Sequence, residues 1–180
     1  MWKNRLKDHI GNDCLVSVDG VDCKMPNLKP FWDGWYSQKY NGAGIRWEVG
    51  VCIRTGEIVW IHGPFCPGRW NDLEIFRHSM KFHLHGGERV EADKGYVGEF
   101  PTTVKVYGSW VGSDVKRKEV GGRHETANKR LKDWSCLKKV LRHSILQHSS
   151  MFRAVAVLTQ LRLESGEPLF SVDYDDKEHY

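Results

Sequence analysis

The chain has 180 residues, of which 40% are hydrophobic and 28% are charged, as in ordinary soluble globular domains. Lysine and arginine total 27 against 23 aspartates and glutamates, so the formal net charge of +4 permits a nucleic-acid partner without requiring one. Five cysteines without a close C-x-x-C pair exclude a disulfide framework, and no apolar run is long enough to cross a membrane, so we expect a soluble, intracellular protein with reduced thiols.

The first predicted elements are a short helix and a buried strand. Apolar residues recur every four positions within residues 1–13, which predicts an amphipathic helix. The apolar and β-branched run 14–18 predicts a strand. It ends at Asp19-Gly20, a dipeptide that is typical of a hairpin turn.

A stretch rich in glycine and proline, residues 24–46, precedes two further strands. Residues 46–53 and 58–62 carry the apolar and β-branched residues that strands favour. The four residues 54–57 between them include a glycine, so we expect a hairpin connection.

The next predicted elements are a helix and two strands. Asn71 and Asp72 are both good N-cap residues, and an apolar face follows them, so a helix should begin here. Residues 89–93 predict a strand that ends on Asp93, and residues 104–106 predict a short one.

The C-terminal part is predicted to be mainly helical. Apolar residues recur at three and four positions over residues 124–148, which indicates one long helix with a basic opposite face. Residues 151–163 are apolar around most of the circumference, so we expect a buried helix, and residues 169–172 predict a late strand. The order of these elements predicts an α/β fold with a mixed sheet.

Three acidic residues fall where a metal site could form. Asp19 and Asp93 end the first and fourth predicted strands, and Glu125 lies in the first turn of the predicted long helix. If those strands are neighbours, the two aspartates share one edge of the sheet. Three carboxylates in one cleft repel one another unless cations bind, and a pair of divalent ions about 3.5–4 Å apart suits phosphodiester cleavage. Mg²⁺ prefers such oxygen ligands.

Four segments, taken in order, resemble the successive motifs of DDE transposases, most closely the PIF/Harbinger-like superfamily endonuclease domain. The segments are V-D-G-V-D at 18–22, P-G-R-W-N-D at 67–72, E-A-D-K-G-Y at 91–96 and R-H-E-T-A-N-K-R-L-K at 123–132. The resemblance runs from about residue 14 to the end of the last predicted helix.

The resemblance implies an RNase H-like fold, with a mixed five-stranded sheet flanked by helices, and strand cleavage and transfer at transposon ends. It implies two divalent ions, Mg²⁺ or Mn²⁺, held by Asp19, Asp93 and Glu125 as the acidic triad. Asp72 matches a recurrent aspartate that accompanies the site in the family, and an N-cap role explains it equally well.

Basic residues on the predicted long helix are candidate contacts to a DNA backbone: Lys129, Arg130, Lys138, Lys139 and Arg142. A solvated helix face is the alternative interpretation. Trp32, Trp35 and Tyr36 could stack on exposed bases, although packing within the loop explains them as well. The histidines and cysteines lack the paired close spacing of a structural zinc site.

The sequence therefore favours one catalytic domain over residues 1–180, a metal-dependent DNA endonuclease or transposase. Only 18 residues precede Asp19, so we expect no N-terminal DNA-binding domain and a separate protein as the source of that function. The alternative is a domesticated, non-catalytic DNA-binding or scaffolding protein, and a structure-selective nuclease of the same fold is a third hypothesis. The eukaryotic character of the resemblance implies a nuclear location.

Overall fold

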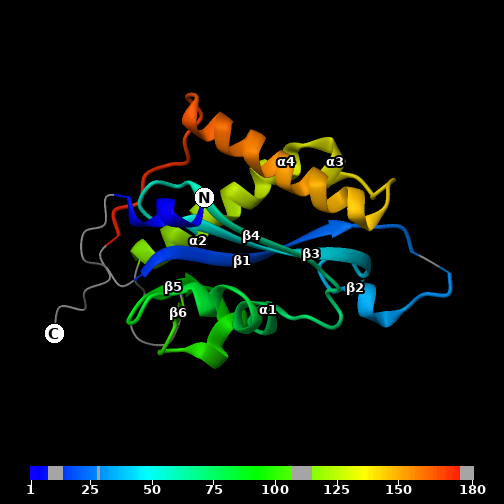
Figure 1. Cartoon of the computed structure of the whole chain (residues 1–180), viewed down its shortest axis with the longest axis horizontal. Helices are drawn as coiled ribbons and strands as arrows, with labels where there is room; N and C mark the ends of the chain where they lie inside the picture. Colours follow the sequence, from blue (N-terminus) through cyan, green and yellow to red (C-terminus); the bar gives the residue numbers. More distant parts are fainter. Residues whose placement is uncertain (8–13, 28, 107–114, 175–180) are drawn as a thin grey trace.

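The structure, a computed structural model, describes residues 1–7, 14–27, 29–106 and 115–174. A mixed sheet lies at its centre, with helices on both faces (Figure 1). One face is covered by α2 (Val115–Asp133), α3 (Ser135–Lys138) and α4 (Ile145–Glu164), and the other by α1 (Asp72–His78). The expected α/β fold with a mixed sheet flanked by helices is confirmed, in agreement with an RNase H-like architecture.

The sheet has six strands: β1 (Cys14–Lys24), β2 (Tyr36–Ser37), β3 (Gly42–Cys52), β4 (Ile58–Phe65), β5 (Arg89–Ala92) and β6 (Val104–Val106). β1 lies between β3, which is antiparallel to it, and β5, which is parallel. β4 pairs antiparallel with the other side of β3, and β6 pairs parallel with β5. The sixth strand, beyond the five expected, is β2, which adds only two residues beside the start of β3.

The predicted hairpin at Asp19-Gly20 is wrong, because β1 runs straight through it. Asp19 pairs with Val49 and Gly20 with Glu48, and the ladder continues to Lys24. The partner strand β3 is as long as β1, 11 residues, so the backbone hydrogen bonds of a continuous ladder outweigh a local turn preference. Asp19 therefore lies in the middle of a strand rather than at its end.

The predicted long helix over residues 124–148 is also wrong. α2 begins at Val115 and ends at Asp133, after which Trp134 is extended and α3 forms a single turn. Ser144, also extended, caps α4 by accepting a hydrogen bond from Gln147 N. These extended residues divide one continuous apolar pattern into three helices. Glu125 consequently lies in the interior of α2 rather than in a first turn.

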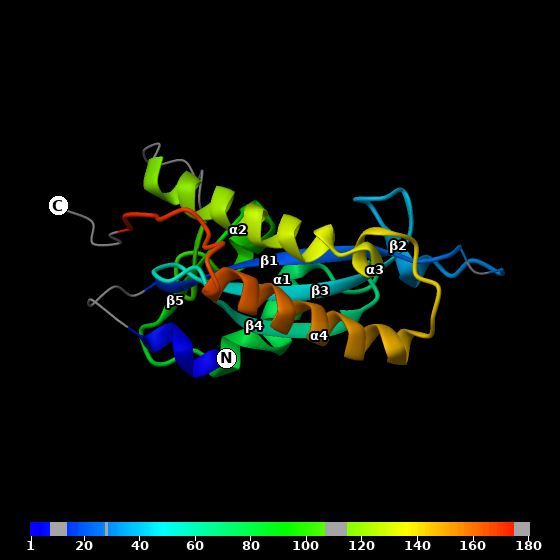
Figure 2. The same cartoon turned by 90° about the horizontal axis from the view of Figure 1, so that it is seen from above.

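α4 is longer than predicted and only partly buried. Phe152, Val155 and Ala156 face the sheet, and Phe152 stacks on Trp47 with ring centroids 4.3 Å apart. The opposite face is open, with Leu146 83% and Leu161 51% exposed, so the expectation of a buried helix is wrong. Figure 2 shows α2 and α4 lying side by side over the same face of the sheet.

Short segments complete the described part of the chain. They include the 3-10 helices η1 (Trp2–Leu6), η2 (Asp33–Trp35), η3 (Met80–His83) and η4 (Lys94–Glu99). The predicted first helix is confirmed only as η1, since residues 8–13 lie outside the described residues. Residues 169–172 are irregular rather than a strand. None of the described helices is long and apolar enough to span a bilayer.

Candidate active site

Asp19, in β1, and Asp93, directly after β5, occupy corresponding positions along two parallel strands. Ser17 of β1 is in register with Glu91 of β5, so each aspartate follows a paired residue by two positions. β5 ends at Ala92, and Asp93 caps η4 by accepting a hydrogen bond from Gly95 N at 2.8 Å. The condition set from the sequence, that the two strands are neighbours, is met, and it brings the two aspartates to one region of the sheet.

Asp72 joins these aspartates from the other side of β1. A Cβ built on Gly20 would lie less than 3.0 Å from Oδ1 of Asp72, so this carboxylate occupies the space that a side chain at position 20 would fill. The N-cap of α1 is Asn71, which forms a capping box with Glu74. The N-cap explanation for Asp72 is therefore wrong. The side chain of Asp72 faces β1 instead of capping the helix.

α2 contacts β1 through two side-chain pairs, one of which holds Asp19. Ser17 Oγ lies 2.8 Å from Nδ1 of His124, and Asn128 Nδ2 donates to Oδ2 of Asp19 at 2.9 Å. Positions two apart on a strand share a face, as do positions four apart on a helix, so the two contacts lie along one line. Gly20 N donates to the other oxygen, Oδ1 of Asp19, at 2.7 Å.

Glu125 reaches the same region from α2. It is exposed and lines, together with Asp19, a cleft of about 730 Å³. Asn128 lies one helical turn further along and lines this cleft too. Glu125 therefore shares a cleft with Asp19, while Asp72 and Asp93 approach Asp19 from the α1 and β5 sides.

The carboxylates influence one another electrostatically. Burial raises the pKa of Asp19 to about 6, against the opposing effect of Lys39, and the neighbouring charges of Asp72 and Asp93 raise it further. The pKa of Asp72 is also raised, first by burial, although Arg46 and Lys39 lower it. Repulsion among these side chains thus favours binding of a cation or a proton.

The donor atoms suit a hard divalent cation, although their positions do not form a complete ligand set. Oδ1 of Asp72 is buried without a hydrogen-bond partner, and Arg46 Nη1 lies 3.4 Å from it. Carboxylate oxygens are the ligands that Mg²⁺ and Mn²⁺ prefer. Within the described ranges, no three His, Cys, Asp or Glu side chains are grouped closely enough to hold a metal ion.

Five lysines surround Asp19 and Glu125 in the cleft: Lys24, Lys39, Lys129, Lys132 and Lys138. Lys39 Nζ donates to the carbonyl of Gly20 at 2.6 Å, directly beside Asp19. The predicted contacts Lys129 and Lys138 are in this set. Arg130 instead donates to the carbonyls of Glu167 and Pro168, and Lys139 and Arg142 are exposed outside the lining set.

Sequence reasoning missed Lys39 and Asn128. Asn128 could have been found, since it follows Glu125 by three positions and so shares its helix face. Lys39 lies in an irregular stretch without a periodic pattern, and only the tertiary structure places it beside Asp19.

A family model described as DDE superfamily endonuclease matches residues 18–160. The match includes all four acidic residues of the site and all the residues that line the cleft. No curated protein and no solved structure matches the chain.

Proposed function

The chain belongs to the DDE superfamily endonucleases, and from this membership we propose that it is a metal-dependent DNA endonuclease that also joins transposon ends. The observation that supports this most directly is the placement of Asp19. Its carboxylate contacts α2, repels two other aspartates and lines a cleft with Glu125 and five lysines. A phosphodiester is the substrate that such a mixture of carboxylates and lysines fits.

Asp19, Asp93 and Glu125 would hold two divalent ions, Mg²⁺ or Mn²⁺, with Asp72 as an auxiliary ligand. When bound, such ions supply an activated water and stabilise the leaving oxygen. The protein contributes orientation. Asn128 and Gly20 N each fix one oxygen of Asp19, so the carboxylate has a defined direction before substrate arrives.

The lysines of the cleft would bind the DNA backbone on either side of the cleaved bond. Their charge offsets the phosphates, whose repulsion by the aspartates would otherwise oppose binding. Lys39 donates to Gly20 O and its charge acts on Asp19, so it would contact the reacting phosphate. Activity of the Harbinger type, a separate DNA-binding partner and a nuclear location complete the proposal.

One observation favours the alternative of a domesticated, non-catalytic DNA-binding or scaffolding protein. The acidic side chains of the described residues lie near one another without forming a three-ligand group. A protein that kept the fold and the basic cleft after losing catalysis would bind DNA without needing the ions. The two hypotheses differ in whether the aspartates bind divalent cations.

The test is a calorimetric titration of Mn²⁺ into the protein and into Asp93→Asn, followed by a nicking assay on supercoiled DNA. We expect saturable binding and nicking in the parent and loss of both in the variant. The matched control is Glu164→Gln, which removes an exposed carboxylate at the end of α4. Nicking that survives Asp93→Asn, or no Mn²⁺ binding with DNA present, would contradict the proposal.

A further inference from the structure

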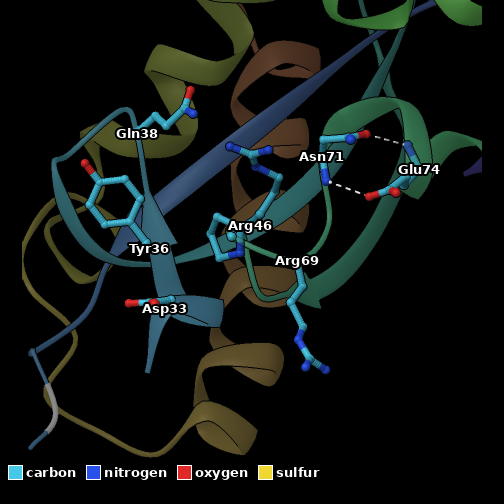
Figure 3. Close-up of a pocket in the computed structure, with 9 residues that line it drawn as sticks. Asp33, Tyr36, Gln38, Arg46, Arg69, Asn71 and Glu74 are labelled. Carbon is cyan, nitrogen blue, oxygen red and sulfur yellow. Dashed lines mark hydrogen bonds between the residues drawn. The ribbon is translucent and has the colours of Figure 1, made fainter. Parts of the chain in front are cut away.

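A second cavity, of about 630 Å³, is lined in part by Arg46, which also contacts Asp22 and Asp72. It is lined by Asp33, Tyr36, Gln38, Arg46, Pro67, Gly68, Arg69, Asn71 and Glu74. Figure 3 shows Tyr36 and Gln38 on one side, Asn71 and Glu74 on the other, and Arg46 between them. The P-G-R-W-N-D segment, which the acidic site uses only through Asp72, thus forms one wall of this cavity.

The two walls are fastened to each other. Gly68 N donates to the carbonyl of Gly34 at 3.0 Å, and a Cβ on Gly68 would lie less than 3.0 Å from the carbonyl oxygen of Asp33. A glycine is therefore required for the loop before α1 to approach the backbone of η2 this closely. The cavity is consequently built into the fold before any ligand enters.

Tyr36 supplies a flat aromatic wall. Tyr36 is 38% exposed, and its hydroxyl donates to Oδ1 of Asn41 at 2.6 Å, which holds the ring at its outer end. Trp32 and Trp35, the other candidates for base stacking, behave differently, because they pack edge to face with ring centroids 5.9 Å apart. Packing thus explains the two tryptophans, whereas Tyr36 lines the cavity.

Polar groups line the rest of the cavity. Oδ1 of Asn71 accepts the capping bond from Glu74 N, so the Nδ2 group is the donor that Asn71 can offer a ligand. Gln38 is exposed and can donate and accept through its amide. Arg69 is also exposed, with its guanidinium 5.0 Å from the Trp32 ring. An aromatic face, two amides and a cation together match the base edge, ring and phosphate of a nucleotide.

Arg46 links this cavity to the acidic site. Its Nε and Nη2 donate to the two oxygens of Asp22 at 2.7 and 3.0 Å, and its Nη1 lies 3.4 Å from Asp72. Asn71 and Asp72 are also consecutive, one lining the cavity and the other the acidic site. Arg46 and the Asn71-Asp72 pair therefore connect the cavity to the acidic site.

We propose that the cavity holds one unpaired nucleotide of the DNA strand next to the phosphodiester that is cleaved, an inference that rests on the proposed function. A paired base cannot enter, because its edge is bonded to its partner and its faces are stacked within the duplex. An unstacked base can insert against Tyr36 and offer its edge to Gln38 and Asn71. Asparagine and glutamine amides match the edge of adenine best.

The test compares two short fluorescein-labelled duplexes, one fully paired and one with a single unpaired adenine, by fluorescence anisotropy with Ca²⁺ present. We expect the parent to bind the second duplex about tenfold more tightly. Tyr36→Leu should lose this preference and bind the paired duplex as the parent does. Tyr36→Phe keeps the ring and should keep the preference. Phe82→Leu, which removes a ring that is 77% exposed elsewhere, is the matched control.

The outcomes separate this inference from the proposed function. Equal binding of both duplexes by the parent, or a preference that persists in Tyr36→Leu, would overturn the nucleotide pocket and leave the proposed function standing. Absence of binding to either duplex would contradict both. A cooperative thermal unfolding transition at the parent's temperature shows that the fold of each variant is intact.

Discussion

The carboxylate of Asp72 lies directly against the backbone of Gly20, in the space where any other residue would place its Cβ. This contact lets an acidic side chain from the start of α1 reach the strand that carries Asp19. It explains why the D-G dipeptide occurs in the middle of β1 rather than at a turn. Asp19 supplies a carboxylate, and Gly20 leaves room for a second one.

Replacing Gly20 with alanine should displace Asp72 while leaving the fold largely intact. The atom that the new Cβ would meet is the end of a side chain, which can rotate away at a cost of about 1 kcal/mol in the free energy of unfolding. Affinity for Mn²⁺ should fall about tenfold if Asp72 assists the site. Denaturant unfolding and calorimetry measure the two quantities.

The matched control for that change is Gly122→Ala within α2. Among the described residues, and apart from its chain neighbours and the nearby backbone of its own helix, a Cβ at this position would meet no heavy atom within 4 Å. The change should therefore stabilise the helix by up to about 1 kcal/mol and leave Mn²⁺ affinity unchanged. Unchanged affinity in Gly20→Ala would show that Asp72 has no part in metal binding.

The acidic positions could be predicted from the sequence, whereas their surroundings could not. Asp93 follows a short apolar strand that the sequence predicts, whereas the pairing of that strand with β1 is shown only by the structure. The D-G dipeptide is a strong local turn signal and predicts a strand end at Asp19, yet pairing with the 11-residue strand β3 overrides it. The local sequence therefore indicates that Asp19 belongs to the site, but not that Asp19 lies within a continuous strand.

The ends of the helix that carries Glu125 likewise could not be predicted from the sequence. Apolar spacing over residues 124–148 is continuous, and the breaks at Trp134 and Ser144 depend on backbone conformations that the spacing does not reveal. Lys39 reaches Gly20 from a segment without periodicity. Contacts between distant segments therefore decide which cations and amides surround the predicted carboxylates.

Asn128→Ala should weaken metal binding without touching any proposed ligand. Asn128 Nδ2 is the donor that fixes Oδ2 of Asp19, and loss of such an orienting bond typically lowers metal affinity about tenfold or more. Calorimetry with Mn²⁺ measures this. Asn4→Ala is the control, since Asn4 donates to Glu57 in the same way at 3.0 Å. Equal affinities in both variants would rule out an orienting role.

Glu48→Gln should stabilise the protein at alkaline pH. Burial raises the pKa of Glu48 to about 7, from 4.5, although Trp60 and Ser79 donate to its Oε2. A carboxyl with a raised pKa stabilises the fold below about pH 4.5, and this contribution is lost as the pH rises through about 7. At alkaline pH the ionised carboxylate therefore costs on the order of 3 kcal/mol, which the neutral amide avoids.

Urea unfolding on either side of that pH range, near pH 5 and pH 8.5, measures the effect. The advantage of Glu48→Gln should appear mainly at the higher pH. Glu164→Gln, at an exposed position, should show no such pH-dependent gain. An equal change in Glu48→Gln at both pH values would mean that Glu48 does not titrate in this range.

Lys138 should contribute more to the salt dependence of DNA binding than its neighbour Lys139. Both lysines are exposed and carry the same charge, but only Lys138 is among the residues that line the cleft with Asp19 and Glu125. Each lysine that contacts a phosphate releases about one counterion, so Lys138→Ala should reduce the slope of log affinity against log salt by about 1, and Lys139→Ala by less. Anisotropy with a labelled duplex over a range of NaCl concentrations measures both slopes. If DNA binds in this cleft, Lys138→Ala must reduce the slope more than Lys139→Ala does. Equal slopes in the two variants would therefore place the DNA outside the cleft.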